Sequence, residues 1–469
     1  MIRHEHIYIN GRWVRPTTTN MIDVVDPATG EPIAVVPSCG QPEVDEAVAA
    51  ARAAFDAWAG RPVEERCALL EVLTAAVRLD ADQLAGLIEL ELGAPAALAR
   101  SEHVDVPVAM LEALIAQSGK PADEWIGNSL VTREPVGVVA AITPWNYPLY
   151  QLVAKVGPAL LTGCTVVLKP AEATPLSAYR FVQLVHDSGF PPGVLNLVPG
   201  RGVVVGEALS AAPDVDMVSF TGSTNAGRRV AVVAAQTMKR VALELGGKSA
   251  SLVVSGADLE VAVRATVENC MSNTGQSCSA WTRLLVPRAE QDAAVEIAAQ
   301  VADELSADMG PLVSQAQYDV VQDYIRLGIA EGARLVAGGL GRPAERSRGF
   351  YTRATVFADV HAGMRVSQEE IFGPVLVVQV YDDLDDAVQQ ANDSAYGLHG
   401  AVWAADDDQA LAVARRLRTG QVDLNGGAFN VAAPFGGYKQ SGTGRELGRF
   451  GLEEFLEVKA IQFLEERVI

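Results

Sequence analysis

The chain has 469 residues, of which 49% are hydrophobic and 20% charged, and its formal net charge is −21. At roughly 100–200 residues per domain this length predicts two or three domains, and the acidic balance argues against nucleic acid or an anionic membrane as the main partner. The five cysteines form no CxxC pair or metal-spaced cluster, and no signal-like segment or membrane-length apolar run is visible, so we expect a cytoplasmic protein with reduced thiols and no metal site.

The first half of the chain alternates helices with short apolar strands. Helical spacing covers 42–59 and 63–78, and further helices are expected at 175–188 and 202–212. The expected strands are apolar runs closed by turn residues, and they lie within 137–146, 164–175, 193–200, 216–224 and 240–249. This alternation predicts a parallel sheet with helices on both faces.

A second α/β set follows residue 246. Its expected strands lie within 250–258, 283–290, 334–339 and 374–382, and its helices within 259–273 and 315–332. Two strand-like segments, 122–137 and 457–469, have no evident partner in either set. We expect them to pair with another subunit; the alternative is that they are edge strands within the same chain.

Cys278 lies in a polar turn, NTGQSCSAWTR, just after a predicted helix that Gly275 ends. A thiol in such a turn can be reached and can ionise, as a nucleophile must. The alternative is a small core residue, which is how we interpret Cys270 inside the preceding helix.

Glu244 and Asn146 each follow an apolar strand, where open α/β sheets place their ligands. Burial at such a place raises the pKa of a carboxylate and makes it a better base, whereas an ion pair or helix cap is the alternative for Glu244. The neutral amide of Asn146 suits an oxyanion, although in isolation this position favours a simple turn Asn.

Three further strand ends carry groups suited to a dinucleotide. Gly200, Gly202 and Gly206 follow one strand in a spacing close to, but not the same as, GxGxxG. The FTGS turn supplies Gly222 and Ser223, and the KPAE turn supplies Lys169 and Glu172. A carboxylate beside a ribose 2′-hydroxyl favours NAD over NADP.

Together these segments resemble the aldehyde dehydrogenase superfamily, specifically its hydrolytic, NAD-preferring branch. Seven motifs of that family occur in order from 144 to 446: PWN (144–146), KPAE (169–172), FTGS (220–223), LELGGK (243–248), GQSC (275–278), EEIFGP (369–374) and PFGGYKQSGTGRE (434–446). The resemblance extends from about residue 7 to the C-terminus.

The resemblance implies a catalytic role for three residues. Cys278 would attack the aldehyde, Asn146 and the Cys278 backbone N–H would hold the oxyanion, and Glu244 would activate the water that hydrolyses the thioester. The implied cofactor residues are Trp145, Lys169, Glu172, Gly202, Gly206, Gly222, Ser223, Glu370 and Phe372. The implied lining of the aldehyde tunnel is Tyr147, Tyr150, Ser277, Ser279, Phe429 and Phe435, with Lys155 and Arg283 as the nearest cations.

The family fold implies a Rossmann-like NAD-binding domain (1–121 and 138–245), a catalytic α/β domain (246–440) and a β oligomerisation arm (122–137 and 457–469), and a homodimer or homotetramer. Trp281 is bulkier than the family's usual residue there, and 301–308 suggests a shortened surface loop.

Three alternatives remain at this stage. A CoA-acylating semialdehyde dehydrogenase usually lacks the LELGGK glutamate, and a silent protein on the same fold would be expected to lose part of the set of Cys278, Glu244 and Asn146. A cysteine hydrolase needs a histidine partner, and none of the six histidines lies in a recognisable motif.

Overall fold

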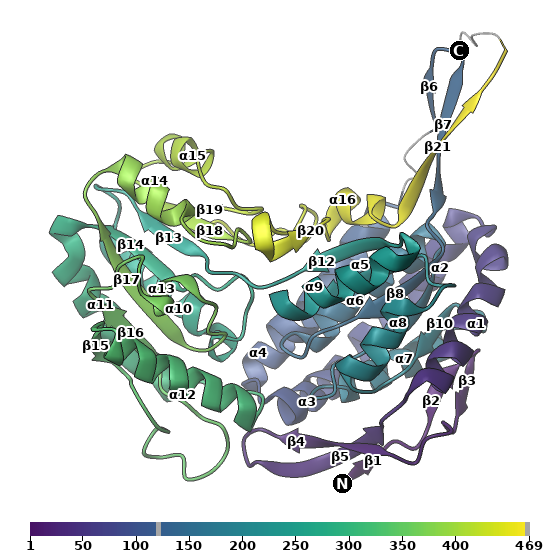
Figure 1. Ribbon diagram of the computed structural model, residues 1–469, viewed down its shortest axis with the longest axis horizontal. Helices are drawn as coiled ribbons and strands as arrows, with labels where there is room; N and C mark the ends of the chain where they lie inside the picture. Colours follow the sequence, from purple (N-terminus) through teal and green to yellow (C-terminus); the bar gives the residue numbers. More distant parts are fainter. Residues whose placement is uncertain (119–122, 465–469) are drawn as a thin grey trace.

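A computed structural model describes residues 1–118 and 123–464 (Figure 1). Its strands form four sheets, of eight, seven, three and three strands. Figure 1 shows the two larger sheets side by side, each wrapped by helices, and a narrow arm that projects from the body. The molecule is therefore of the mixed α/β class that the strand–helix alternation predicts.

The eight-stranded sheet has the order β20-β12-β11-β8-β9-β10-β2-β3. Its five central strands run parallel and carry the predicted apolar runs: β8 (Val138–Ile142), β9 (Thr165–Lys169), β10 (Leu195–Leu197), β11 (Met217–Thr221) and β12 (Arg240–Glu244). The antiparallel edges are β2 (Ile7–Ile9), β3 (Arg12–Val14) and β20 (Gly442–Thr443). The strand order reverses between β8 and β11, which is where such sheets bind ligands.

Helices cover both faces of this sheet because both faces are apolar. One face packs against α1 (Gln41–Ala59), α8 (Glu207–Ala211) and α9 (Thr224–Ala234). The other face packs against α6 (Pro148–Thr162) and α7 (Leu176–Asp187), with α2 (Val63–Leu79), α3 (Ala81–Leu92) and α5 (Val106–Ala116) in the same cluster. The predicted helix at 202–212 begins as a π-helical turn, Gly202–Gly206, before α8.

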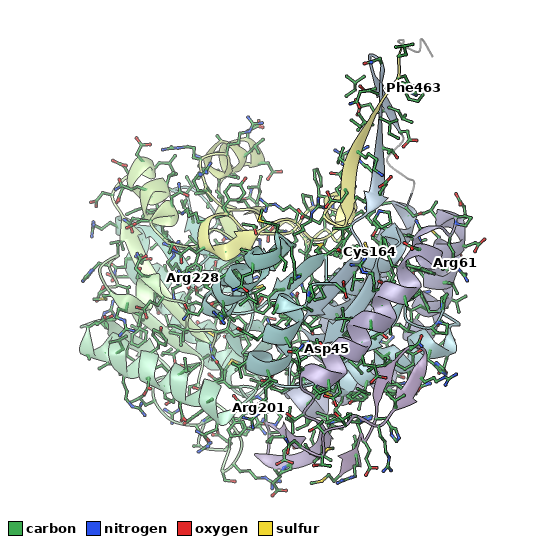
Figure 2. All side chains as sticks on the ribbon, turned by 45° about the vertical axis from the view of Figure 1, so that its right-hand side comes forward. Asp45, Arg61, Cys164, Arg201, Arg228 and Phe463 are labelled. Atoms are coloured by element: carbon green, nitrogen blue, oxygen red, sulfur yellow. The ribbon has the colours of Figure 1, made fainter. Side chains whose placement is uncertain are left out.

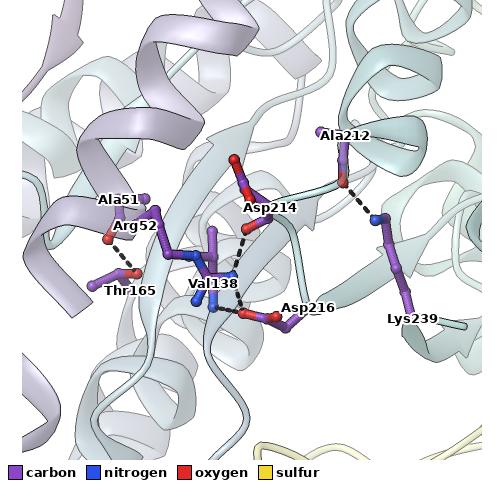
Figure 3. A network of polar contacts seen from close by, with 8 residues as sticks. All are labelled: Ala51, Arg52, Val138, Thr165, Ala212, Asp214, Asp216 and Lys239. Carbon is purple, nitrogen blue, oxygen red and sulfur yellow. Dashed lines mark hydrogen bonds and ion pairs between the residues drawn. The ribbon is translucent and has the colours of Figure 1, made fainter. Parts of the chain in front are cut away.

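A polar network ties α1 to the starting edge of the parallel strands (Figure 3). Asp216 accepts hydrogen bonds from the Val138 N–H (2.7 Å) and from Arg52 of α1 (2.5 Å), and Thr165 donates to Ala51 O (3.0 Å). A Cβ at Gly137, whose φ is +130°, would lie 1.8 Å from the Asp216 carboxylate, so this approach requires glycine. The network fixes one edge of the sheet and leaves the opposite edge for chemistry.

The seven-stranded sheet has the order β15-β16-β17-β14-β13-β18-β19, and only the β15–β16 pair is antiparallel. Its strands are β13 (Ala250–Val253), β14 (Arg283–Pro287), β15 (Arg334–Ala337), β16 (Thr355–Ala358), β17 (Val375–Tyr381), β18 (Gly400–Trp403) and β19 (Asp423–Leu424). Its helices include α10 (Leu259–Met271), α11 (Gln291–Ser306), α12 (Gln315–Ala330), α14 (Leu384–Asn392) and α15 (Asp407–Ala414). The segment 301–308, expected to shorten a surface loop, forms the last turns of α11 and two residues after it.

The two strand-like segments without an evident partner pair with each other. β6 (Glu124–Ile126), β7 (Ser129–Pro135) and β21 (Leu456–Gln462) form an antiparallel sheet, with β7 and β21 aligned over seven residue pairs. This sheet is the projecting arm, and Phe463 lies within it (Figure 2). Residues 122 and 465–469 of the predicted segments lie outside the described residues.

A small sheet of β1 (Ile2–Arg3), β4 (Met21–Asp26) and β5 (Glu31–Pro37) completes the N-terminal region. Among the described residues, no helix combines the length and apolar character that crossing a membrane requires.

Candidate active site

Four neighbouring strands place the predicted polar groups along one edge of the larger sheet. In the order β9, β8, β11, β12, these strands end at Lys169, Ile142, Thr221 and Glu244. The register aligns Ile142 with Lys169 and Thr221 with Glu244, so the turns that follow open at the same level. The structure therefore brings together groups that lie up to 100 residues apart in the sequence.

Cys278 reaches this edge from the second sheet. After α10 ends, Asn273, Thr274 and Gly275 all adopt positive φ (+48°, +58° and +69°) and turn the chain sharply. A Cβ at Gly275 would lie 2.2 Å from the Gly373 backbone, so glycine is required there. The half-buried Cys278 thus contacts the core of the first sheet, whereas Cys270 remains buried inside its helix.

The Cys278 thiol is held neutral. Burial raises its pKa to about 12, and the nearby carboxylates of Glu244, Glu370 and Glu446 act in the same direction. Burial and these carboxylates oppose the ionisation that the polar turn is expected to allow. The surrounding atoms resist negative charge on the sulfur.

Asn146 is fixed by the segment that carries the thiol. Its Nδ2 donates to Gln276 O at 3.0 Å, and Asn273 Nδ2 donates to Asn146 O at 2.9 Å. Gln276 is anchored in turn, because its Oε1 accepts from Val313 N at 2.9 Å. The amide has two N–H groups, so one remains for a ligand beside Cys278.

Glu244 is buried without a hydrogen-bond partner for its Oε2 atom, and no ion pair reaches it among the described residues. A Cβ at Gly436 would lie 2.6 Å from Glu244 Oε1, so the FGG turn passes directly over the carboxylate. Burial and the Glu446 carboxylate raise the pKa of Glu244 well above its ordinary range, while Lys155 and Arg445 oppose that shift. The ion-pair and helix-cap alternatives are therefore wrong.

Lys155 and Glu446 form a buried ion pair next to Glu244. Lys155 is fully buried, donates to Thr221 Oγ1 at 2.6 Å and contacts a carboxylate oxygen of Glu446. From the sequence, Lys155 is expected as a nearby cation or as part of a proton relay, and Glu446 has no expected role. The one available signal was that Glu446 ends the PFGGYKQSGTGRE motif.

The groups expected to bind a dinucleotide lie on one side of this edge. Lys169 Nζ lies 3.5 Å from Glu172 Oε2, and the Gly202 N–H points at Glu172 Oε1 at 3.5 Å. Ser223 caps the N-terminus of α9, and only Gly222 and Ser223 separate this helix from the end of β11. These turns present backbone N–H groups and a carboxylate to the same space.

Glu370 and Phe372 close the other side. The Gly247 N–H donates to Glu370 Oε1 at 3.0 Å, and burial raises the pKa of Glu370 to about 7. A Cβ at Gly246 would lie 2.0 Å from Glu370 Oε2, which explains the paired glycines of the motif. Phe372 meets Trp145 edge to face, with the ring centroids 5.2 Å apart.

The predicted aldehyde wall is a continuous row of rings. Centroid distances are 6.2 Å for Tyr147–Tyr150, 6.5 Å for Tyr150–Phe429 and 6.2 Å for Phe429–Phe435. Phe429 is 43% exposed whereas Phe435 is 5% exposed, so the row reaches the surface at Phe429 and is covered on either side of it. Ser277 and Ser279 flank the thiol, and their hydroxyl oxygens lie 3.1 Å apart.

Arg283 does not belong to this wall. Its guanidinium donates to the backbone oxygens of Lys248, Gln390 and Ala391 at 2.8–2.9 Å. The predicted cationic candidate is therefore a structural residue of the second sheet.

The chain belongs to the aldehyde dehydrogenase family, whose model matches residues 13–461. Members of this family oxidise aldehydes to acids. Two curated relatives are a 3-succinoylsemialdehyde-pyridine dehydrogenase of Pseudomonas sp., 47% identical over 98% of both chains, and a geranial dehydrogenase of Castellaniella defragrans, 42% identical over 99% of both.

Solved structures agree. A mutant aldehyde dehydrogenase C of Pseudomonas syringae, complexed with NAD+ and octanal, matches with a TM-score of 0.96 at 47% identity, covering 98% of this chain and 96% of that one. A Mycobacterium tuberculosis aldehyde dehydrogenase complexed with NAD+ matches with a TM-score of 0.97 at 41% identity, covering both chains fully. The predicted family and fold are confirmed.

Proposed function

We propose that this aldehyde dehydrogenase uses NAD and proceeds through a covalent intermediate on Cys278 that Glu244 helps to hydrolyse. The observation that carries the proposal is the placement of Glu244: a buried carboxylate with one oxygen unpaired, near enough to Cys278 to perturb its pKa. A carboxylate with a raised pKa is suited to take a proton from water near neutral pH.

The thiol first loses its proton to water and then attacks the aldehyde carbon, forming a C–S bond while the carbonyl electrons move to oxygen. The free N–H of Asn146 and the backbone N–H of Cys278 stabilise that oxyanion. Glu172, Ser223 and Glu370 are among the residues that would hold NAD, which would supply the hydride acceptor, and loss of the hydride leaves a thioester on Cys278. Glu244 then removes a proton from the attacking water, and collapse of the adduct releases the acid and the thiolate.

The residues around the glycine turn fit NAD. Ser223 and the start of α9 supply N–H groups to a pyrophosphate, and Glu172, 44% exposed, can accept from a ribose 2′-hydroxyl and repel a 2′-phosphate. Lys169, Glu370 and the other predicted positions complete this set: Trp145, Gly202, Gly206, Gly222 and Phe372. NADP is accordingly the less favoured cofactor.

The alternatives fit less well. In a CoA-acylating reaction a thiol, not water, attacks the thioester, so the buried Glu244 would have no water to activate. A catalytically silent protein would not need to retain Glu244. A hydrolase needs a histidine at the thiol, but His103 stacks on Tyr147 at 4.6 Å and the ring nitrogens of His399 face Ser279 and Asp423.

The substrate that best fits the ring row is a neutral, apolar or aromatic aldehyde, because Lys155 is committed to Glu446 and Arg283 faces elsewhere. The side chains of this aromatic wall determine whether the enzyme accepts many aldehydes, as the general aldehyde dehydrogenases do, or a single substrate. We also propose that 1–121 with 138–245 binds NAD, that 246–440 is catalytic, that the arm joins a homodimer or homotetramer, and that the protein is cytoplasmic.

The test is absorbance at 340 nm with NAD and a panel of aldehydes of equal length, with and without a terminal carboxylate. We expect aldehyde-dependent NADH formation, with kcat/KM higher for the uncharged member of each pair. Absence of NADH with every aldehyde, or a consistent preference for the carboxylate-bearing member, would refute the activity or the substrate class respectively.

A further inference from the structure

One buried histidine contacts the nucleophile segment from outside it. His399 directly precedes β18 and is 5% exposed. Its Nδ1 lies 3.1 Å from the carbonyl oxygen of Ser279, the residue after Cys278. Its Nε2 lies 3.0 Å from Oδ2 of Asp423, which is on the neighbouring strand β19. The three groups form a line from a carboxylate, through an imidazole, to the backbone beside the thiol.

The chemistry of the partners fixes the proton on this ring. A carbonyl oxygen only accepts hydrogen bonds, so Nδ1 must carry the proton that it shares with Ser279. Asp423 Oδ2 lies 3.0 Å from Nε2, but the geometry there is not that of a hydrogen bond. Asp423 therefore bounds the ring on its far side, and the imidazole holds the Ser279 carbonyl.

Packing leaves the ring little freedom. The Trp281 ring lies 5.8 Å from His399 and 6.3 Å from Trp403. The backbone N–H of Trp281 donates to Asn269 Oδ1 at 2.9 Å, which fixes the chain at this residue. The neighbouring Trp403 ring is fixed as well, because its Nε1 donates to the buried Ser251 hydroxyl at 3.0 Å. The bulky residue at 281 thus forms one wall of the histidine site.

Few other contacts hold the backbone of 277–280. Among the described residues, its remaining hydrogen bonds are short-range turns such as Ala280 N–H to Ser277 O at 3.3 Å. The His399 contact is the one made by a side chain of another element. A single hydrogen bond at this place therefore constrains where the Cys278 sulfur can lie.

We propose that His399, with Asp423 against the far side of its ring, is a positioning residue that holds the Cys278 segment in its reactive geometry. The proposal rests on Cys278 being the nucleophile of the proposed function. His399 does not touch the reacting atoms; it acts through the Ser279 carbonyl. Misplacement of a reacting group by about 1 Å can cost up to about 10²-fold in rate.

The decisive comparison is His399→Asn against His399→Gln and His399→Leu. The Asn amide nitrogen occupies roughly the place of Nδ1 and can donate to Ser279 O, whereas the Gln amide reaches toward Asp423, and Leu does neither. Two quantities are measured on the full-length enzyme: kcat and KM for the aldehyde, and the rate of Cys278 alkylation by iodoacetamide, followed by mass spectrometry. The alkylation rate requires neither NAD nor aldehyde.

We expect His399→Leu and His399→Gln to lower kcat and the alkylation rate about tenfold, the factor expected for one lost buried hydrogen bond, with KM changed less than about twofold. His399→Asn should retain most of both rates. Asp423→Asn, which can still contact the ring, should resemble the wild type more than Asp423→Ala does. His361→Leu, at an exposed histidine, is the matched control and should change neither rate.

Equal impairment of the Asn and Leu variants, or wild-type rates in a folded Leu variant, would overturn the proposal. If His399→Leu does not fold, the comparison of His399→Asn with His399→Gln tests the proposal. Equal kcat and equal alkylation rates for these two variants would also overturn it. Failure of the proposed function would give a different result. The wild-type enzyme would then form no NADH with any aldehyde, while the alkylation rate of Cys278 would still be lower in His399→Leu and His399→Gln than in His399→Asn.

Discussion

Replacing Glu244 by Gln isolates the hydrolytic step. The substitution is nearly isosteric, keeps the close contact with Gly436, and breaks no hydrogen bond or ion pair of the side chain among the described residues. It removes a carboxylate that raises the pKa of Cys278, so the pKa of that thiol falls and attack on the aldehyde is not slowed. A neutral amide, however, cannot take a proton from the attacking water.

The expected result is one fast turnover followed by a stall. Loss of general-base help typically costs about 10²–10⁴-fold, so the steady-state rate of NADH formation should fall by that factor while a burst close to one NADH per active site remains. Rapid mixing at 340 nm measures both phases. Mass spectrometry of the quenched enzyme should find the acyl group on the peptide that contains Cys278.

Glu91→Gln is the matched control, because Glu91 is also a fully buried carboxylate but lies away from the thiol, where it accepts from Ser177 N–H at 3.1 Å. It should lower Tm and leave kcat nearly unchanged. Absence of a burst in Glu244→Gln with NAD binding intact would refute the assignment to hydrolysis and place Glu244 at thiol deprotonation. Near-normal steady-state turnover would make Glu244 a structural residue.

Three further outcomes are expected. Cys278→Ala should abolish dehydrogenase and esterase activity while Cys270→Ala, inside α10, retains most of both; equal loss in a folded Cys270→Ala protein would contradict the assignment. Glu172→Ser should narrow the ratio of kcat/KM for NAD over NADP, each tenfold being about 1.4 kcal/mol, and a wild-type preference for NADP would exclude the proposed role. Light scattering should show a dimer or tetramer that Val458→Asp, in the exposed face of β21, shifts toward monomer; a wild-type monomer at micromolar concentration would count against the arm's role.

The parallel strands were predictable because burial on both faces leaves a continuous apolar run. β8 and β9 are fully buried and have no polar alternation to obscure them. The placement of Asn146 and Glu244 at the same edge of the sheet also followed from sequence, since the carboxyl ends of parallel strands in one sheet share one edge. Identification of Glu370 and Phe372 required the family resemblance, because they come from the other sheet.

Contacts between distant segments could not be predicted. Lys155 and Glu446 are 291 residues apart, and their pairing depends on how the C-terminal segment crosses the sheet edge. β7 and β21 pair over a separation of more than 300 residues, so each looked like a strand without a partner. Burial is the main cause of the raised pKa of Cys278, and the carboxylates that add to it likewise lie on three separate segments.

The pair of Lys155 and Glu446 has a consequence for the pH dependence of turnover. Glu244 must be ionised to act as a base, and its pKa is raised by burial and by the Glu446 carboxylate, so kcat should fall on the acid side at a pH above the ordinary carboxyl range. Glu446→Gln removes one cause of that rise and leaves the Lys155 cation uncompensated nearby, and both changes lower the pKa of Glu244. The acid limb of the kcat–pH profile should therefore move to lower pH. The same raised pKa means that the contribution of Glu244 to stability is fully present below the unfolded-state pKa and is lost as pH rises through the folded-state pKa, so the Tm of Glu244→Gln should gain on the wild type with rising pH. An acid limb that moves upward or stays in place in a folded Glu446→Gln enzyme would show that a group other than Glu244 controls it.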